Sequence, residues 1–260
     1  MSGRIRGERD GPIGFLIVDH LERRNALDDA MWLDIPAVVR SLDEDPQVRV
    51  IVLRGAGEQA FVSGADISQF TQLRMGEAAL AYDASNTAAF AALSSAHKPV
   101  ISMIHGFCIG GGVAISVCAD LRYAADDAVF AVPAARLGLG YPLVGVEALI
   151  QLLGVARAKE LFFTARRFDA SEALRMGLLN EVFPKAELEK RVREIALMIA
   201  ENAPLTLRAV KRAAVELAKP ESRRDHTAAV AAVMDCFVSE DYAEGVRAFL
   251  AKRKPEFKGR

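Results

Sequence analysis

The sequence has few cysteines and no excess of charge of either sign. Its 260 residues include three cysteines, Cys108, Cys118 and Cys236, in apolar surroundings without a C-x-x-C pair. This pattern argues against a disulfide framework and predicts reduced thiols in the core of a cytoplasmic protein. The 33 basic and 34 acidic residues leave a formal net charge of −1, so we expect neither a nucleic acid nor a membrane surface as partner.

Long apolar runs and the common cofactor motifs are missing as well. The first ten residues are charged and only a short apolar run follows, which argues against a signal peptide or a transmembrane span. The glycines at 110–112 fit neither the G-x-G-x-x-G pattern nor a P-loop, and there is no G-x-S-x-G elbow. The four histidines form no cluster with metal-ligand spacing. We therefore expect no metal and no nicotinamide cofactor.

The residues that are present predict an α/β core followed by helices. Apolar residues make up 52% of the chain, enough for a continuous interior. Short β-branched runs alternate with segments of helical spacing, and beyond Gly145 the pattern is almost entirely helical. The predicted strands include Gly14–Asp19, Val48–Arg54 and Pro99–His105, and the predicted helices begin near Asp28, Gly76 and Gly111. Asp169, with Glu172 three residues later, predicts a capped helix that ends at Gly177.

The most informative segment runs from Gly106 to Asp120, where three consecutive glycines end an apolar run and open a helix. Glycine lets the main chain turn sharply and come close to a ligand, and the first amides of a helix have no partner within it. Fixed amides of this kind stabilise a developing oxyanion. The segment therefore predicts an anion site built from backbone, with no acid or base beside it.

This segment is one of several motifs that appear in a fixed order along the chain. They are Arg24–Leu27, Ala60–Ile67, Gly106–Asp120, Phe130–Leu139, Ala170–Leu178 and Phe249–Phe257. Through them the sequence resembles the crotonase superfamily, the enoyl-CoA hydratase/isomerase group, over almost its whole length. The resemblance implies a spiral of ββα repeats over residues 1–200 that carries an acyl-CoA site. It also implies a helical trimerisation region over residues 201–260, and a homotrimer or a homohexamer.

The resemblance further implies a coenzyme A thioester as the substrate, with no separate cofactor. The thioester oxygen would be held by two backbone amides, which motif matching assigns to Ala65 and Gly111. Such an enzyme stabilises the enolate that forms at the α-carbon. The positions assigned to substrate binding are Arg23 and Arg24, near the CoA phosphates, and Ala26, Asp66, Ile67 and Gly110, with Phe249 and Lys252 from a neighbouring subunit. The two arginines are equally well interpreted as solvent-exposed surface charges, and Asp66 is more simply interpreted as the N-cap of the next helix.

The sequence departs from the family at two positions. Hydratases of the family carry one glutamate just after the triple glycine and another directly after the proline of the later loop. Here these positions are Ala114 and Ala134. Alanine has no proton to transfer, so the general acid–base contribution, typically about 10² to 10⁴ for each group, is missing from its usual place. This departure argues against a conventional hydration.

Tyr141 is the candidate that would replace the missing carboxylates. It aligns with a tyrosine of methylmalonyl-CoA decarboxylase, although the histidine of that enzyme is replaced by Ala65 here. A decarboxylase or another enolate-forming lyase that uses Tyr141 is therefore one alternative, and a protein that binds acyl-CoA without turnover is another. His105, Glu147, Tyr82 and Asp83 are weaker candidates. The choice between hydration, isomerisation and decarboxylation, and the identity of the acyl chain, stay open.

Overall fold

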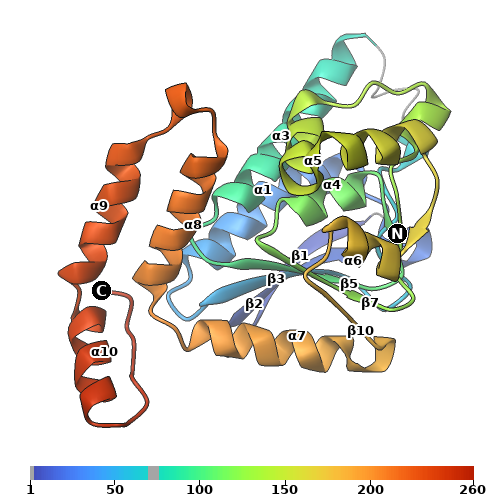
Figure 1. Cartoon of the computed structure of the whole chain (residues 1–260). Helices are drawn as coiled ribbons and strands as arrows, with labels where there is room; N and C mark the ends of the chain where they lie inside the picture. The colour runs from blue at the N-terminus through green and yellow to red at the C-terminus, as the bar shows by residue number, and fades with distance from the viewer. Residues whose placement is uncertain (1–2, 70–75) are drawn as a thin grey trace.

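The structure, a computed structural model, describes residues 3–69 and 76–260 and has two β-sheets at its centre (Figure 1). The strands are β1 (Arg4–Asp10), β2 (Ile13–Asp19), β3 (Val50–Gly55), β4 (Ala60–Val62), β5 (Val100–Ile104), β6 (Phe107–Ile109), β7 (Leu121–Ala125), β8 (Val129–Ala131), β9 (Phe168–Asp169) and β10 (Glu181–Phe183). A six-stranded sheet has the order β1-β2-β3-β5-β7-β10, and a four-stranded sheet has the order β4-β6-β8-β9. Neighbouring strands are parallel except for the pairs β1-β2 and β8-β9.

Helices follow the strand pairs and then dominate the second half of the chain. They are α1 (Asp29–Glu44), α3 (Glu77–Ser95), α4 (Gly111–Val117), α5 (Leu143–Thr164), α6 (Ala170–Met176), α7 (Lys185–Ala200), α8 (Pro204–Ala218), α9 (His226–Phe237) and α10 (Glu240–Leu250). Short 3₁₀ turns lie at η1 (Leu21–Arg23), η2 (Ile67–Gln69), η3 (Pro133–Leu137) and η4 (Glu221–Arg223). Within the described residues, none of the helices combines the length and the apolar character needed to cross a bilayer.

The chain winds through the two sheets as a repeated ββα unit. After β3 the chain passes to β4 in the second sheet and then to α3, and the same order recurs as β5-β6-α4 and β7-β8-α5. Each unit therefore adds one strand to each sheet before its helix returns the chain. This arrangement confirms the spiral of ββα repeats that the sequence predicted.

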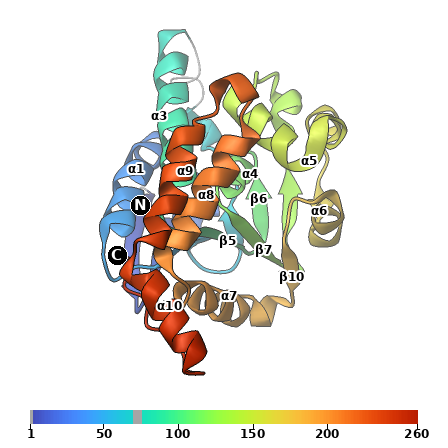
Figure 2. The ribbon, with the colours of Figure 1, turned by 60° about the vertical axis from the view of Figure 1, so that its left-hand side comes forward.

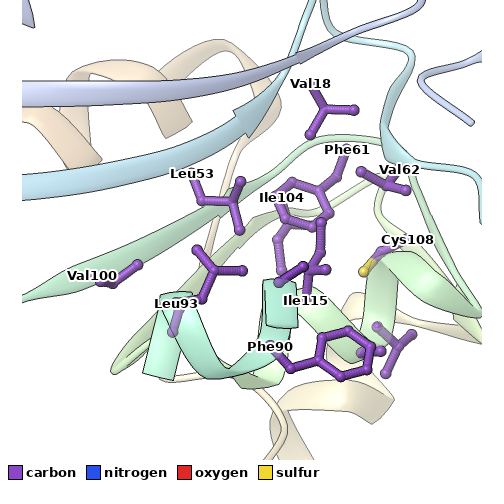
Figure 3. Packing of buried hydrophobic residues seen from close by; sticks show 14 of the residues in the cluster. Val18, Leu53, Phe61, Val62, Phe90, Leu93, Val100, Ile104, Cys108 and Ile115 are labelled. Carbon is purple, nitrogen blue, oxygen red and sulfur yellow. The ribbon is translucent and has the colours of Figure 1, made fainter. Parts of the chain in front are cut away.

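The six-stranded sheet is covered on both faces, as the side chains of strand β3 show. Its side chains alternate, so that Ile51 and Leu53 join one buried cluster while Val50 and Val52 join another. The first cluster lies between the sheets and α1, α3 and α4, and Figure 3 shows Leu53, Phe90 and Ile115 among its side chains. The second cluster lies under α7, on the opposite face of the sheet (Figure 1). The strand predicted at Val48–Arg54 is therefore confirmed, as Val50–Gly55, and it is buried on both faces.

The last three helices lie on the outer edge of the molecule, away from α5 and α6 (Figure 1). Helices α8 and α9 run side by side in front of the sheet (Figure 2). Lys211 ties α8 to the core, because its Nζ donates to Asp120 Oδ2 at 2.8 Å and to the Lys98 carbonyl at 3.0 Å. Helices α9 and α10 nevertheless expose large apolar side chains, including Phe237, at 56%, and Phe249, at 83%.

The helix boundaries follow the local capping signals of the sequence. Asp28 accepts a hydrogen bond from the Met31 amide at 2.9 Å and begins α1. Asp169 accepts from the Glu172 amide at 2.7 Å and begins α6, which ends at Gly177 in the left-handed conformation. The predicted capped helix from Asp169 to Gly177 is therefore confirmed.

Candidate active site

A largely apolar cavity of about 150 Å³ opens beside the triple-glycine segment. Its wall comes from α1, from the segment after β4, from α3, from the start of α4, and from η3 with the loop that follows it. The residues that line it are Trp32, Ser63, Gly64, Ala65, Ile67, Tyr82, Asn86, Phe90, Ile109, Gly110, Gly111, Ala114, Val132, Pro133, Ala134, Leu137, Leu139, Tyr141 and Pro142. The cavity thus brings together segments that lie more than 100 residues apart in the sequence.

Two backbone amides meet in one corner of this cavity. A Cβ atom added at Gly111 would lie 3.7 Å from the Ala65 nitrogen and 3.1 Å from Trp32 Cζ2. A side chain at position 111 would therefore come into van der Waals contact with the Ala65 amide nitrogen. Among the described residues, no acceptor receives a hydrogen bond from either amide. The corner is left with two unpaired donors, which is the arrangement that binds an oxyanion.

The segments that carry the two amides are fixed by neighbouring hydrogen bonds. Leu27 pairs with the first segment, because its amide donates to the Gly64 carbonyl and its carbonyl accepts from the Asp66 amide, both at 2.8 Å. The Gly110 amide donates to the Ala131 carbonyl at 2.8 Å, and Gly110 has a φ of 53°, which favours glycine. These bonds hold the amides of Ala65 and Gly111 in place before any ligand arrives.

Asn25 organises the turn that supports Leu27. Its buried side chain donates to the carbonyls of Ala56, at 3.0 Å, and Ala60, at 2.8 Å, and accepts from the His20 amide at 3.0 Å. Arg24 and Asn25 both have positive φ angles, so the chain turns sharply at these two residues. The motif at Arg24–Leu27 therefore acts through the backbone, by placing the strand-like pair between Leu27 and Ala65.

The side chains around the cavity carry little acid–base chemistry. Ala114 on α4 and Ala134 in η3 are both buried in its wall, at the two positions where hydratases of the family carry glutamates. No aspartate, glutamate, histidine, lysine or arginine belongs to the wall within the described part of the chain. Tyr141 does line the cavity, and its ring packs edge-to-face on Phe162 with the centroids 4.9 Å apart. The structure therefore brings Tyr141 into the same cavity as Ala65 and Gly111.

The residues predicted to bind CoA lie at the edge of this cavity or away from it. Ile67 and Gly110 line it, whereas Arg23 pairs with Asp66 at 3.0 Å outside the wall. Burial raises the pKa of the Asp66 carboxyl, but hydrogen bonds from Ser68 and the charge of Arg23 outweigh it, so its pKa lies below the ordinary value. The Ser68 amide donates to Asp66, so the predicted helix cap at Asp66 is confirmed.

The other predicted binding residues are also placed. The Arg24 guanidinium lies over the ring of Phe107, 5.2 Å from its centroid. The carbonyl oxygen of Ala26 lies 3.0 Å from His20 Nδ1, so Ala26 makes this contact through its backbone and not through its side chain. Phe249 and Lys252 lie at the end of α10 and do not line the cavity of their own chain.

Of the four weaker candidates, one lines the cavity and three do not. Tyr82 lines the cavity, and its hydroxyl accepts a hydrogen bond from Trp32 Nε1 at 3.0 Å. His105, Asp83 and Glu147 are not part of the wall. His105 is buried, and this burial together with the charge of Arg54 lowers the pKa of its imidazole. It is therefore neutral at pH 7, as expected for a core histidine.

Three wall residues were not predicted from the sequence: Trp32, Asn86 and Phe90. Asn86 and Phe90 follow Tyr82 on α3 at intervals of four residues, so Tyr82, Asn86 and Phe90 lie on one face of the helix. This spacing is visible in the sequence as Tyr82-x₃-Asn86-x₃-Phe90 and could have marked the face that meets the acyl group. In the described part of the chain, no three His, Cys, Asp or Glu side chains come close enough to hold a metal ion.

Comparison with known proteins identifies the class to which this fold and cavity belong. The family model described as enoyl-CoA hydratase/isomerase matches residues 13–260. A solved enoyl-CoA hydratase/carnithine racemase from Magnetospirillum magneticum superimposes with a TM-score of 0.93 at 33% identity, covering 98% of this chain and 96% of that one. The ββα spiral is therefore a crotonase fold, and the protein is an acyl-CoA enzyme of this fold.

Curated relatives agree over the full length. The crotonyl-CoA hydratase of Syntrophomonas wolfei is 34% identical over 250 residues, 96% of each chain, and the carnitinyl-CoA dehydratase of Escherichia coli strain K12 is 35% identical over 265 residues, 100% of each chain. A peroxisomal dienoyl-CoA isomerase of Arabidopsis thaliana is 35% identical over 97% of this chain and 95% of its own. The chain belongs to the enoyl-CoA hydratase/isomerase family. Because these relatives carry the names of three different reactions, membership alone does not fix the reaction.

Proposed function

We propose that this enzyme stabilises the enolate of a short acyl-CoA thioester between the amides of Ala65 and Gly111. The observation that carries the proposal is the pair of unpaired amides in one corner of an apolar cavity. When charge moves onto the thioester oxygen, both donors strengthen their hydrogen bonds without rearrangement, and the apolar wall keeps water from weakening them. Gly110 and Ile67 would flank the bound thioester.

The size of the cavity supports a short acyl group. A volume of about 150 Å³ equals that of engineered protein cavities that bind benzene, so roughly six heavy atoms fill it. The wall is formed by apolar residues such as Phe90, Val132 and Leu139, which favours hydrocarbon over charge. Longer chains would extend beyond this volume.

Hydration or isomerisation is the nominal reaction of the family, and the two alanines argue against its usual form. Ala114 and Ala134 cannot activate water or move a proton, so we expect hydration of crotonyl-CoA to be slow. If the enzyme nevertheless hydrates crotonyl-CoA at an ordinary enzymatic rate, another group in the wall supplies the proton transfer. A lack of any turnover with intact binding would favour an acyl-CoA-binding protein.

Decarboxylation is the second candidate, and the position of Tyr141 in the cavity favours it. In a malonyl-type thioester the bond between the α-carbon and the carboxylate breaks, and its electron pair forms the enolate as CO₂ leaves. No base is needed for this step. The α-carbon then takes a proton, which the Tyr141 hydroxyl would supply and recover from water. A wall without carboxylates also avoids repulsion of the substrate carboxylate.

The remaining assignments concern CoA and assembly. Arg23 and Arg24 lie near the segment of Asp66 and would bind the CoA phosphates, for which guanidinium geometry is suited. We propose that residues 201–260 form a trimerisation region, in which Phe249 and Lys252 serve the site of a neighbouring subunit. The apolar side chains exposed on α9 and α10 support a homotrimer or homohexamer, and light scattering on the purified protein would measure it. We propose the cytoplasm as its location.

Turnover and binding assays test the proposal directly. Crotonyl-CoA is assayed for loss of its enoyl absorbance, and malonyl-CoA and methylmalonyl-CoA are assayed for release of CO₂. Binding of butyryl-CoA is measured by calorimetry on the same preparation. Turnover of a thioester, together with competitive inhibition by butyryl-CoA, is the expected result. If no CoA thioester binds, the proposed function is wrong in every form.

A further inference from the structure

Among the described residues, Asn86 is the one amide side chain in a wall made mostly of apolar groups. It lies on α3 between Tyr82 and Phe90, four residues from each, and all three line the cavity. Much of the rest of the wall is formed by groups without hydrogen-bonding side chains, such as Ala114 and Val132. A polar side chain in this position is unfavourable for packing alone, because an apolar residue of the same size would need no hydrogen bond.

The side-chain oxygen of Asn86 is buried and has no hydrogen-bond donor. The residue is 4% exposed, and its Oδ1 atom accepts no hydrogen bond from any residue that the structure describes. Two other polar groups of the wall are paired with each other, because Trp32 Nε1 donates to the hydroxyl of Tyr82 at 3.0 Å. Buried carbonyl oxygens are nearly always paired in folded proteins, so an unpaired one on a residue that lines a cavity points to a ligand.

We infer that Asn86 is a substrate-positioning residue that selects an acyl group carrying a hydroxyl. The inference rests on the proposed function, which places the acyl group in this cavity. A hydroxyl on the acyl chain would donate its proton to Oδ1 and leave the thioester oxygen with the amides of Ala65 and Gly111. Because the cavity has room for only a short acyl group, the hydroxyl and the thioester contact two parts of one small wall.

The chemistry of a carboxamide separates this role from proton transfer. An amide oxygen accepts hydrogen bonds but does not ionise, so Asn86 cannot act as the general base that the family's glutamates provide. Its effect is on affinity and orientation. An unsubstituted acyl chain leaves the oxygen unpaired, whereas a hydroxyl supplies the missing hydrogen bond. The preference therefore comes from the hydrogen bond that only the hydroxylated acyl group can make.

Calorimetry with matched thioesters tests the inference on the intact enzyme. The ligands are butyryl-CoA, both enantiomers of 3-hydroxybutyryl-CoA, and 4-hydroxybutyryl-CoA, which share the chain length and differ only in the hydroxyl. We expect at least one hydroxylated thioester to bind about tenfold more tightly than butyryl-CoA. In Asn86→Leu this preference disappears while butyryl-CoA binds at least as tightly as to the wild type. In Asn86→Asp, which keeps an oxygen acceptor of the same shape, a preference remains.

Ser85→Ala is the matched control. Ser85 is the neighbouring buried residue on α3, its hydroxyl donates to the Tyr82 carbonyl at 2.8 Å, and it does not line the cavity. Loss of this hydroxyl should leave the ligand preference unchanged. Equal binding of all four thioesters to the wild type overturns the inference even if the Asn86 variants do not fold, and so does a preference that survives in Asn86→Leu. If none of the thioesters binds, the proposed function fails as well.

Discussion

The backbone part and the side-chain part of the cavity wall differ in how much of the family's chemistry they keep. The backbone part, at Ala65 and Gly111, has two amides without an acceptor among the described residues, on segments fixed by neighbouring hydrogen bonds. The side-chain part has alanine at 114 and 134, where hydratases of the family carry glutamates. We propose that the two amides stabilise the charge of an enolate while other groups of the wall move its proton, so that the same pair of amides can serve different reactions.

Removing one amide should produce the largest effect. Gly111→Pro deletes the donor at the first residue of α4, where no bond within the helix is lost. We expect kcat/KM for the productive thioester to fall by about 10² to 10³. Steady-state kinetics on protein with an unchanged melting temperature measure this loss.

The pair Gly111→Ala and Gly140→Ala provides the control for that experiment. A methyl group at 111 would press on Trp32 and contact the Ala65 amide nitrogen, whereas one at 140 meets no atom within 4 Å. Only the first substitution should reduce kcat/KM. Near-normal kinetics in both Gly111 variants would show that the corner does not hold the oxyanion.

Tyr141→Phe tests whether a hydroxyl in the side-chain part does the work of the missing carboxylates. The ring should keep its packing on Phe162, so the variant removes only the hydroxyl. We expect CO₂ release from a malonyl-type thioester to slow by about 10², the lower end of the range for acid–base groups. Tyr242→Phe is the control, because Tyr242 packs on Phe237 in a similar geometry on α10, outside the cavity. Equal rates in the two variants would remove Tyr141 from the mechanism.

Restoring the carboxylates should give the side-chain part of the wall the acid–base groups that hydratases of the family carry there. The double variant Ala114→Glu/Ala134→Glu places two acids in the buried wall, where desolvation raises their pKa toward neutrality. We expect hydration of crotonyl-CoA to rise about tenfold, less than the full contribution of positioned acid–base groups. Ala114→Gln/Ala134→Gln matches the size without the proton. A gain in the glutamine variant equal to that in the glutamate variant would contradict a role for proton transfer.

The smallest expected effect is that of pH. None of the described wall residues titrates between about pH 5 and 8. Nearby Asp66 has a lowered pKa, so it stays ionised there, and its stabilising contribution is lost only as pH falls through that lowered value. We therefore expect kcat/KM of the wild type to change by no more than about twofold over this range. A bell-shaped profile would reveal a titrating group that the wall does not account for.

The sequence predicted the backbone features well and the side chains of the wall less well. The helix that opens at the glycines 110–112, the cap at Asp169 and the strand β3 follow from local conformational and burial patterns, and each was confirmed. Trp32, Asn86 and Phe90 were missed. Their spacing on α1 and α3 marks only a buried face, and which faces meet depends on the packing of helices that are distant in sequence.

The sequence by itself determined the fold and the family, and it predicted the amides of Ala65 and Gly111 as the oxyanion site, because glycine positions and turn residues constrain the backbone locally. It also identified Ala114 and Ala134 as the positions without carboxylates. Only the tertiary structure decided that Tyr141, Tyr82 and Asn86 share one cavity, and that the oxygen of Asn86 is buried there without a partner. The physical reason is that a cavity is the space left between packed elements, so its size and its unpaired atoms depend on how all of them fit together.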